Sequence, residues 1–470
     1  MQPAVARSEP AQALPGAVVA PALEAQRVTP YLGFLFLLLS TATLFDGFDS
    51  AMFGFASPDV RASLGISQGE WGAVATLTRL GVMSSFVFLF FADRVGRRWT
   101  MMATIVGFTA ATFATALVAT KGQFIAVQFV ARLFLTAEAS LAVIMVGEEF
   151  PARVRGRSIA ILASLATAGV MLTAKLQPYV LQGNGGDYAI GRLGHWLVSA
   201  IQAPFGSVSD AAGWRSLYAL GVLPLGLVLL LRLGMKETRR FEAVRARAAE
   251  RPERTWRELF DEAARPWHRE YRRRTAIVAL LWNCVFLVTG PSTVFWVIYA
   301  RESLHLTLYQ VGDIVFWGYA GGVTGSFVGG WLIDRIGRKY TCASMYVLAA
   351  IAIYMLYHVT SIPAQYTWMI LTVFTFAGGN SSTQVYASEL FPTEIRATGY
   401  GWTTNFAGRL TEVFVPFIIG MLIAPLGIPR AMAIVSIGPI LGAALVLRYA
   451  PETRGLTLEQ IEERLRPKPS

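Results

Sequence analysis

Long apolar stretches alternate with short polar gaps along this chain of 470 residues. A helix of about 20 apolar residues spans the roughly 30 Å hydrocarbon core of a bilayer. The pattern therefore predicts an all-α membrane protein with twelve transmembrane helices. We expect these helices at 31–56, 71–91, 99–119, 123–147, 157–181, 214–234, 275–300, 310–333, 340–360, 365–388, 397–424 and 430–450.

A charged cassette occurs twice in the gaps between the apolar stretches. Residues 93–98, DRVGRR, recur 241 residues later at 334–339 as DRIGRK. Further residues repeat at the same spacing, namely Glu148 and Arg155, which correspond to Glu389 and Arg396. Two matches at one offset predict a duplicated six-helix bundle, at 31–234 and 275–450, and such duplication is a known plan of membrane transporters.

Three polar segments lie outside the two bundles. Residues 1–30 are rich in Ala and Pro and lack an unbroken apolar core, which predicts a disordered cytoplasmic tail and not a cleaved signal peptide. Residues 235–274 are expected to form a cytoplasmic linker that contains some helix, because their charges mix sign. Residues 451–470 are expected to form a second cytoplasmic tail.

The N-terminal bundle is longer than its counterpart. From Arg155 to Glu237 is 82 residues, whereas from Arg396 to Glu452 is 56, so the first half holds 26 extra residues. Transmembrane helices have no room for them. We place them in an external loop at about 182–213, where the sequence suggests a turn followed by a short interfacial helix.

Composition and charge agree with a membrane location. Hydrophobic residues make up 54% of the chain and charged residues only 15%, against about 25% charged in soluble domains. The net charge of +11 collects in the gaps after even-numbered helices. The positive-inside rule then puts both termini in the cytoplasm, and no basic groove for nucleic acid is indicated. The two cysteines indicate neither a disulfide framework nor a metal site.

At the two cassettes the chain resembles the major facilitator superfamily, whose signature G-x-x-x-D-R-x-G-R-R is matched in full from Gly330 to Lys339. Residues 46–49 and 54–58 resemble the first helix of its aromatic-acid:proton symporters. Residues 132–138 with 148–151, and 386–393 with 396–399, are similar to its nicotinate-type members. The resemblance implies proton-coupled transport by alternating access.

Ionisable side chains inside the predicted helices are the main functional candidates, because each costs several kcal/mol unless it faces a cavity or a partner. At 1.5 Å per residue, Arg79, Arg132 and Arg409 lie roughly 12, 14 and 18 Å into their helices, at a common level. Asp46 and Asp49 share a face of the first helix nearby. We interpret the arginines as binding an anionic substrate; static pairing, for instance of Arg409 with Glu412, is the alternative.

Proton coupling is assigned to carboxylates within the same region. Asp49 is the first candidate, Asp46 its alternative and Glu138 the next. Lys175, near the external end of the fifth helix, is expected to extend toward the lipid headgroups and receives no role. Further residues that are expected to line a pocket for a planar ring are Asn283, Trp317, Asn380, Gln384, Trp402 and Asn405.

The cassettes and the neighbouring turns carry complementary charges. The resemblance implies that these charges pair across the inner helix ends and close the inside when the outside is open. The residues of this predicted cytoplasmic gate are Asp93, Arg97, Arg98, Glu148, Arg155, Asp334, Arg338, Glu389 and Arg396.

These observations predict a multi-pass inner-membrane symporter of protons with a small organic anion, an aromatic or related carboxylate, that works as a monomer without cofactor or metal. A sugar or polyol carrier of the same fold, a proton-driven exporter and a membrane sensor that does not transport stay open as alternatives. An enzyme is not expected, because the sequence has no nucleotide-binding loop and its four histidines are scattered.

Overall fold

The structure is a computed structural model that describes most of the chain. The described residues are 29–150, 152–182, 188–202, 213–232, 234–237, 257–258, 261, 264–290, 294–391, 395–454 and 460. The predicted tails at 1–30 and 451–470 and the linker at 235–274 lie largely outside them.

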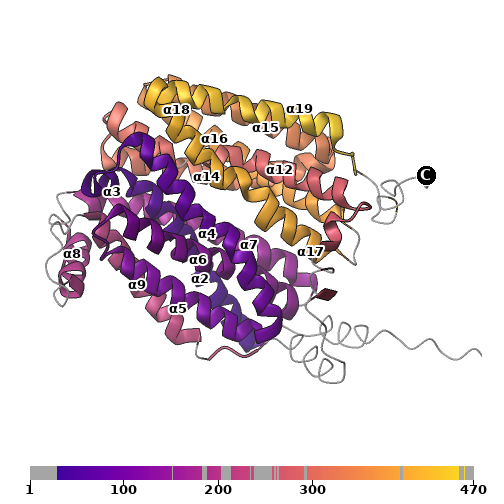
Figure 1. The fold of residues 1–470 in the computed structure, drawn as a ribbon, viewed down its shortest axis with the longest axis horizontal. Helices are drawn as coiled ribbons and strands as arrows, with labels where there is room; N and C mark the ends of the chain where they lie inside the picture. The colour runs from indigo at the N-terminus through magenta and orange to yellow at the C-terminus, as the bar shows by residue number, and fades with distance from the viewer. Residues whose placement is uncertain are drawn as a thin grey trace, which may run out of the picture.

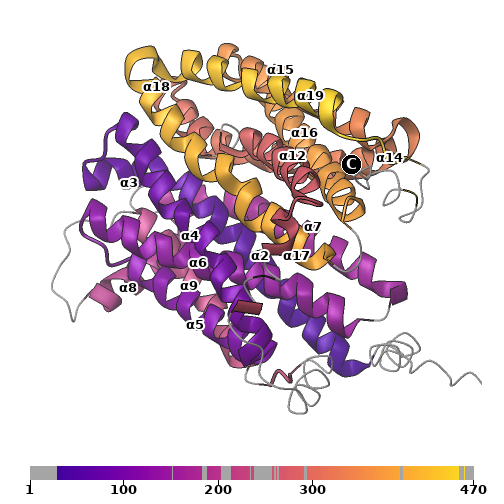
Figure 2. The same ribbon diagram turned by 45° about the vertical axis from the view of Figure 1, so that its right-hand side comes forward.

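Helices from the two halves of the chain form two bundles that lie side by side (Figures 1 and 2). The N-terminal half contains α2 (Pro30–Phe55), α3 (Ser57–Leu64), α4 (Gln68–Val95), α5 (Arg97–Thr115), α6 (Lys121–Glu149), α7 (Ala152–Leu181), α8 (Ala189–Gln202) and α9 (Gly213–Arg232). The C-terminal half contains η3 (Arg265–Trp267), α12 (Arg272–Gly290), α13 (Trp296–Ile298), η5 (Tyr299–Ser303), α14 (Leu308–Ile336), α15 (Arg338–His358), α16 (Ile362–Glu389), α17 (Arg396–Gly401), η6 (Trp402–Phe406), η7 (Ala407–Arg409), α18 (Leu410–Val435) and α19 (Ile437–Tyr449). Each of the twelve predicted spans falls on one of these helices or on a consecutive series of them, which confirms the predicted fold.

Four helical stretches of the described chain are long and apolar enough to cross a membrane by length and composition alone. They are Pro30–Phe55, Lys121–Val146, Arg338–His358 and Trp402–Tyr449.

The duplication is visible in the backbone of the cassettes. The turn between α4 and α5 places Gly96 at φ 110°, and the turn between α14 and α15 places Gly337 at φ 97°. Side chains with a Cβ rarely adopt this conformation, so glycine is required at both equivalent positions. We call the end of the molecule that carries these turns the cassette end, and the opposite end, where α3 and α8 lie, the α3 end (Figure 1).

The predicted helix 275–300 covers α12, α13 and the π-helical η5, and residues 291–293 within it lie outside the described part of the chain. Two other predicted helices are interrupted. The predicted helix 430–450 is divided between the end of α18 at Val435 and α19, which begins at Ile437. The predicted helix 397–424 is also not continuous, because a π-helical segment at Trp402–Phe406 and a 3₁₀ turn at Ala407–Arg409 separate α17 from α18. Such breaks in transporter helices occur where the backbone lines a cavity or is bonded by neighbouring helices.

The insertion of the N-terminal half contains the predicted short helix as α8. This helix packs on α9, where Gly194 faces Ser216, and it exposes Ile190, Leu193 and Trp196 on another face. Residues 183–187 and 203–212, which flank it, lie outside the described part of the chain.

Contact between the halves is close at the α3 end. A Cβ added to Gly72 of α4 would lie 2.2 Å from the carbonyl oxygen of Pro416 in α18, so the two backbones touch. On the other side of the interface, Gly312 of α14 approaches the carbonyl of Ala174 in α7 in the same manner. These contacts fix the position of α4 against α18, and thereby the level at which Arg79 meets the C-terminal half.

Candidate functional site

Two of the three predicted arginines contact the same residue of α18, Arg409 through its carboxylate and Arg79 through its backbone oxygen. Arg409 Nη1 donates a hydrogen bond of 2.7 Å to Glu412 Oε2, and Arg79 Nη1 makes a long contact of 3.5 Å with the backbone oxygen of Glu412. Arg79 belongs to the N-terminal half and Glu412 to the C-terminal half, so this cluster lies on the interface between the halves. The pairing of Arg409 with Glu412 matches the static alternative described above, but Arg409 Nε has no hydrogen-bond partner among the described residues.

The third arginine lies on the N-terminal side of the same region. Arg132 of α6 is 9% exposed, and its Nη1 donates to Ser50 Oγ at 3.1 Å. Its guanidinium lies 5.2 Å from the centre of the Phe53 ring, and that of Arg409 lies 5.1 Å from the Phe286 ring. Aromatic rings at these distances stabilise a desolvated cation and restrict its orientation.

The two aspartates of α2 lie close to these cations. Asp49 is 2% exposed, and neither of its carboxyl oxygens has a hydrogen-bond partner among the described residues. Asp46, which is half-buried, interacts electrostatically with Asp49, Arg132 and Arg409. The structure thus brings the predicted carboxylates and the predicted arginines into one electrostatic cluster.

Glu138 differs from these carboxylates because it has a fixed counter-ion. Arg232, at the end of α9, forms an ion pair with Glu138 and also donates to the Met101 carbonyl at 3.0 Å. Thr104 Oγ1 donates to the other oxygen of Glu138 at 2.6 Å. The pair is buried in the N-terminal half, so Glu138 is not the partner of Arg132. Arg232 is not among the residues predicted from the sequence, because it lies at a helix end.

Two of the predicted ring-pocket residues have well-defined protein contacts. Asn283 is engaged by the backbone of the C-terminal half, donating to the carbonyls of Ala279 and Ala407 and accepting from the Thr411 amide. Trp402 packs against Trp267 and Phe406.

The other predicted pocket residues differ in how far they are exposed. Trp317 is half exposed and its ring contacts that of Phe316. Asn380 and Asn405 are half-buried and Gln384 is exposed. The prediction that these four residues contact a substrate remains untested.

At the cassette end, acidic residues bond to helix N-termini within each half. Glu237 accepts from the backbone amides of Arg97 and Arg98, the nearest at 2.9 Å, and Glu452 accepts from those of Arg338 and Lys339 at 3.1 Å. Carboxylates stabilise helix N-termini through the unpaired amides and the helix dipole. The spacing of these two glutamates reveals the duplication, but this role at the helix N-termini was not predicted from the sequence.

The predicted cytoplasmic gate stays a prediction. Arg338 Nη1 lies 3.7 Å from Asp334 Oδ1 within the same cassette. The side chains of five other predicted gate residues lie outside the described part of the structure, namely Asp93, Glu148, Arg155, Glu389 and Arg396.

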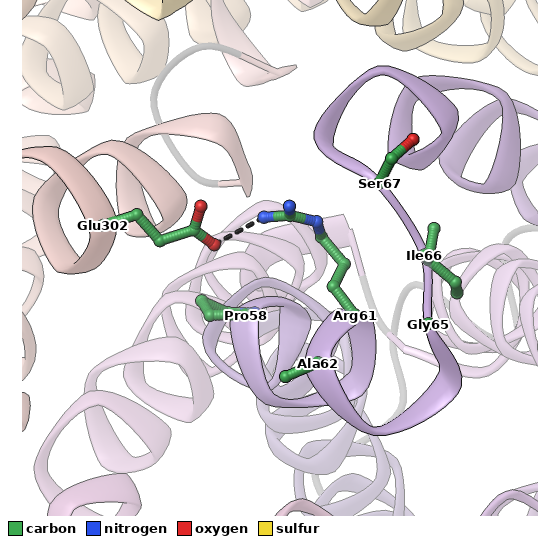
Figure 3. Close-up of a pocket in the computed structure, with 7 residues that line it drawn as sticks. All are labelled: Pro58, Arg61, Ala62, Gly65, Ile66, Ser67 and Glu302. Atoms are coloured by element: carbon green, nitrogen blue, oxygen red, sulfur yellow. Dashed lines mark hydrogen bonds and ion pairs between the residues drawn. The ribbon is translucent and has the colours of Figure 1, made fainter.

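At the α3 end, ion pairs join the two halves. Arg61 of α3 pairs with Glu302 of η5 at 2.5 Å (Figure 3), and Gln68 also donates to Glu302. Arg301 pairs with Asp59 at 2.5 Å. Arg61 and Glu302 are 241 residues apart, the offset of the cassettes, so oppositely charged residues occupy equivalent positions in the two halves. That offset is the sequence signal that would have revealed them.

The insertion and the fifth predicted helix add two contacts at the same end. Lys175, which the sequence predicted to extend toward the lipid headgroups without a role, pairs with Asp313 of α14 and so joins the two halves. Tyr309 Oη donates to Tyr188 Oη at 2.6 Å, and the Tyr179 ring packs edge-on against both tyrosine rings. Tyr188 therefore connects the insertion directly to the C-terminal half.

The matching family model settles the family of this chain. The model described as Major Facilitator Superfamily matches residues 39–410 and 281–470. The chain belongs to the major facilitator superfamily. It is accordingly an integral membrane transporter of small molecules and not an enzyme.

Two curated relatives and one solved structure show how far the likeness extends. The niacin transporter NiaP of Acinetobacter baylyi is 24% identical, over 89% of this chain and 93% of the relative. The gallate transporter of Pseudomonas putida is 25% identical, over 89% and 92%. The xylose transporter XylE of E. coli, solved in an inward open conformation, superposes with a TM-score of 0.69 at 18% identity, over 91% of this chain and 98% of XylE. At that identity the structural likeness shows the fold alone.

Proposed function

We propose that this transporter is a symporter that couples protons to a small organic anion, an aromatic or related carboxylate, by alternating access. The observation that carries the proposal is the cluster of Arg79, Arg132 and Arg409 at the interface between the halves. Guanidinium remains charged when it is desolvated and presents paired N–H donors that match a carboxylate. The niacin and gallate relatives support an aromatic acid, because both named compounds are aromatic carboxylic acids.

Proton coupling follows from the charge balance of the cluster. The three arginines share the region with the carboxyl groups of Asp46, Asp49 and Glu412. If all six groups are ionised their charges cancel, so each proton that binds leaves one cation free to attract an anion. Asp49 suits this role best, since its buried carboxylate has no hydrogen-bond partner among the residues that the structure describes, and such a group is costly unless it is neutralised.

The orientation of the protein completes the proposal. The positive-inside rule assigns the cassette end and both termini to the cytoplasm and the α3 end to the outside, in a bacterial inner membrane. Ion pairs then close the outer face, and the substrate site opens toward the cytoplasm. We expect the monomer to be the functional unit.

A sugar or polyol carrier is the second candidate. It is less well supported, because a sugar site would be dominated by polar amides and not by three arginines, and the amide of Asn283 bonds the protein. A proton-driven exporter of the organic anion would use the same site with the opposite direction of net transport. Flux measurements in proteoliposomes of known orientation distinguish this exporter from the proposed symporter.

Ligand-dependent thermal stabilisation of the purified protein tests the substrate class. We expect aromatic carboxylates to raise the melting temperature and neutral sugars to leave it unchanged. Arg132→Lys and Arg409→Lys should each weaken apparent affinity on the order of tenfold, because a lost two-pronged contact costs about 1.5–3 kcal/mol. Stabilisation by sugars alone, or normal anion affinity in both variants, would contradict the proposal.

Asp49→Asn tests the coupling. An asparagine mimics the permanently protonated carboxyl group, so uphill accumulation driven by a pH gradient should be lost while substrate exchange across proteoliposome membranes persists. If Asp49→Asn and Asp46→Asn both still concentrate the substrate, coupling resides elsewhere, and Glu138 is the next carboxylate to test.

A further inference from the structure

The break between α17 and α18 places Arg409 at the end of an irregular stretch of backbone. The π-helical turn ends at Phe406, and the 3₁₀ turn that follows ends at Arg409, which has φ −96° and ψ 5°. An interrupted helix leaves backbone donors and acceptors without their regular partners. The direction in which Arg409 leaves the backbone therefore depends on whatever bonds these groups.

Asn283 of α12 forms hydrogen bonds to backbone groups of this stretch on both sides of Arg409. Its Nδ2 donates to the Ala407 carbonyl at 2.8 Å and to the Ala279 carbonyl of its own helix at 2.7 Å. Its Oδ1 accepts from the Thr411 amide at 2.8 Å, and Thr411 Oγ1 donates to the Asn283 carbonyl at 2.8 Å. Both amide donors and the amide acceptor of Asn283 are thus engaged by the protein.

The same face of α12 also contacts the break and the guanidinium. A Cβ added to Gly408 would lie 2.0 Å from the Thr403 carbonyl and 2.6 Å from the Trp282 Cβ, so the break packs directly on α12. The Trp282 ring stacks on Phe286 at 5.8 Å, and Phe286 lies under Arg409 at 5.1 Å. Backbone and guanidinium of Arg409 are therefore both held by one helix.

We propose that Asn283 is a positioning residue that holds the interrupted helix in the conformation in which Arg409 can bind the substrate anion. This inference rests on the proposed function, since it requires Arg409 to contact the anion. Asn283 itself does not touch the ligand; it acts by bonding residues 407 and 411. Without these bonds the break can relax, and the two-pronged geometry of Arg409 is lost.

A double-mutant cycle tests the proposal, with affinity measured by titrating the purified full-length protein with benzoate and stability by its melting temperature. Asn283→Ala is expected to weaken binding on the order of tenfold, similar to Arg409→Lys. The double variant should bind no worse than Arg409→Lys alone, because both changes disable the same contact. Thr411→Val, which retains the shape of the side chain, should weaken benzoate binding less than Asn283→Ala does. This variant tests the proposal if Asn283→Ala does not fold.

Gln365→Ala is the matched control. Gln365 is also a buried amide that bonds helices of the C-terminal half, accepting from Trp296 Nε1 and donating to the carbonyls of Leu356 and Val359. Its removal should lower the melting temperature without changing benzoate affinity.

The outcomes separate the two hypotheses. If Arg409→Lys weakens benzoate binding but Asn283→Ala and Thr411→Val lower only the melting temperature, as Gln365→Ala does, the positioning role is wrong. It is equally wrong if the losses of Asn283→Ala and Arg409→Lys multiply in the double variant, because Asn283 then acts independently of Arg409. If Arg409→Lys itself binds benzoate normally, the proposed anion site is the part that fails.

Discussion

The two ends of the molecule use similar charged residues in opposite ways. At the α3 end, Arg61 and Arg301 of different halves pair with Glu302 and Asp59 across the interface. At the cassette end, Glu237 and Glu452 bond helix N-termini of their own halves. Between residues whose side chains the structure describes, the ion pairs that join the halves all lie at the α3 end.

This difference separates two functions of charge in a transporter. A pair within one half stabilises that half in every conformation, so it contributes to folding and not to switching. A pair between the halves exists in one conformation only and therefore shifts the equilibrium between conformations. Three predictions test this distinction, from the largest expected effect to the smallest.

Reversal of one charge at the α3 end should have the largest effect. Arg61→Glu places two carboxylates opposite each other at Glu302, so the closed state of this end should lose at least tenfold in population. Spin labels at the exposed positions 122 and 361, one in each half, would report the change as a longer distance. Combining Arg61→Glu with Glu302→Arg should restore the original distance; no recovery in the double variant would show that the pair does not hold this end closed.

Removal of a carboxylate at the cassette end should affect stability alone. Glu452→Gln weakens the bonds to the first amides of α15, which should cost about 1 kcal/mol of unfolding free energy. Glu237→Gln is the equivalent change in the other half. Both should lower the melting temperature and leave the distance between the labels at 122 and 361 unchanged. A changed distance distribution would contradict the assignment of these residues to folding.

Loss of the tyrosine contact should have the smallest effect. Tyr188→Phe removes the hydroxyl that bonds Tyr309 but keeps the ring that packs on Tyr179, so about 0.5–1.5 kcal/mol is lost from the closed state. We expect a change of a few-fold in transport rate with benzoate affinity near that of the unchanged protein, because the insertion lies away from the arginines. Tyr179→Leu removes the ring that packs on both Tyr188 and Tyr309, so it should change the transport rate more than Tyr188→Phe does. A loss of benzoate binding in Tyr188→Phe would refute a role restricted to access.

The fold was predictable because its signals are local or repeated. Apolar stretches gave the helices, and the shared offset of the cassettes gave the duplication, which the backbone of Gly96 and Gly337 reproduces. The sequence also predicts a common level for Arg79, Arg132 and Arg409, because depth in a helix follows from the number of residues and the rise per residue.

The partners of the buried groups were not predictable in the same way. Pairing of Glu138 with Arg232 depends on how α6 and α9 rotate about their axes, which hydrophobic periodicity defines only loosely in a helix that is apolar on most faces. The role of Asn283 depends on a break in a different helix. Residues 402–409 of that helix contain no proline that would predict the break. Tertiary packing decides both.

The inverted charges at equivalent positions also constrain which halves can assemble. Arg61 of one half meets Glu302 of the other at the place where two identical halves would bring identical side chains together. Two copies of the N-terminal half would set arginine against arginine there, and two copies of the C-terminal half would set glutamate against glutamate. The interface therefore disfavours symmetric pairs, so the ion pair that closes the α3 end also makes each half select its unlike counterpart during assembly.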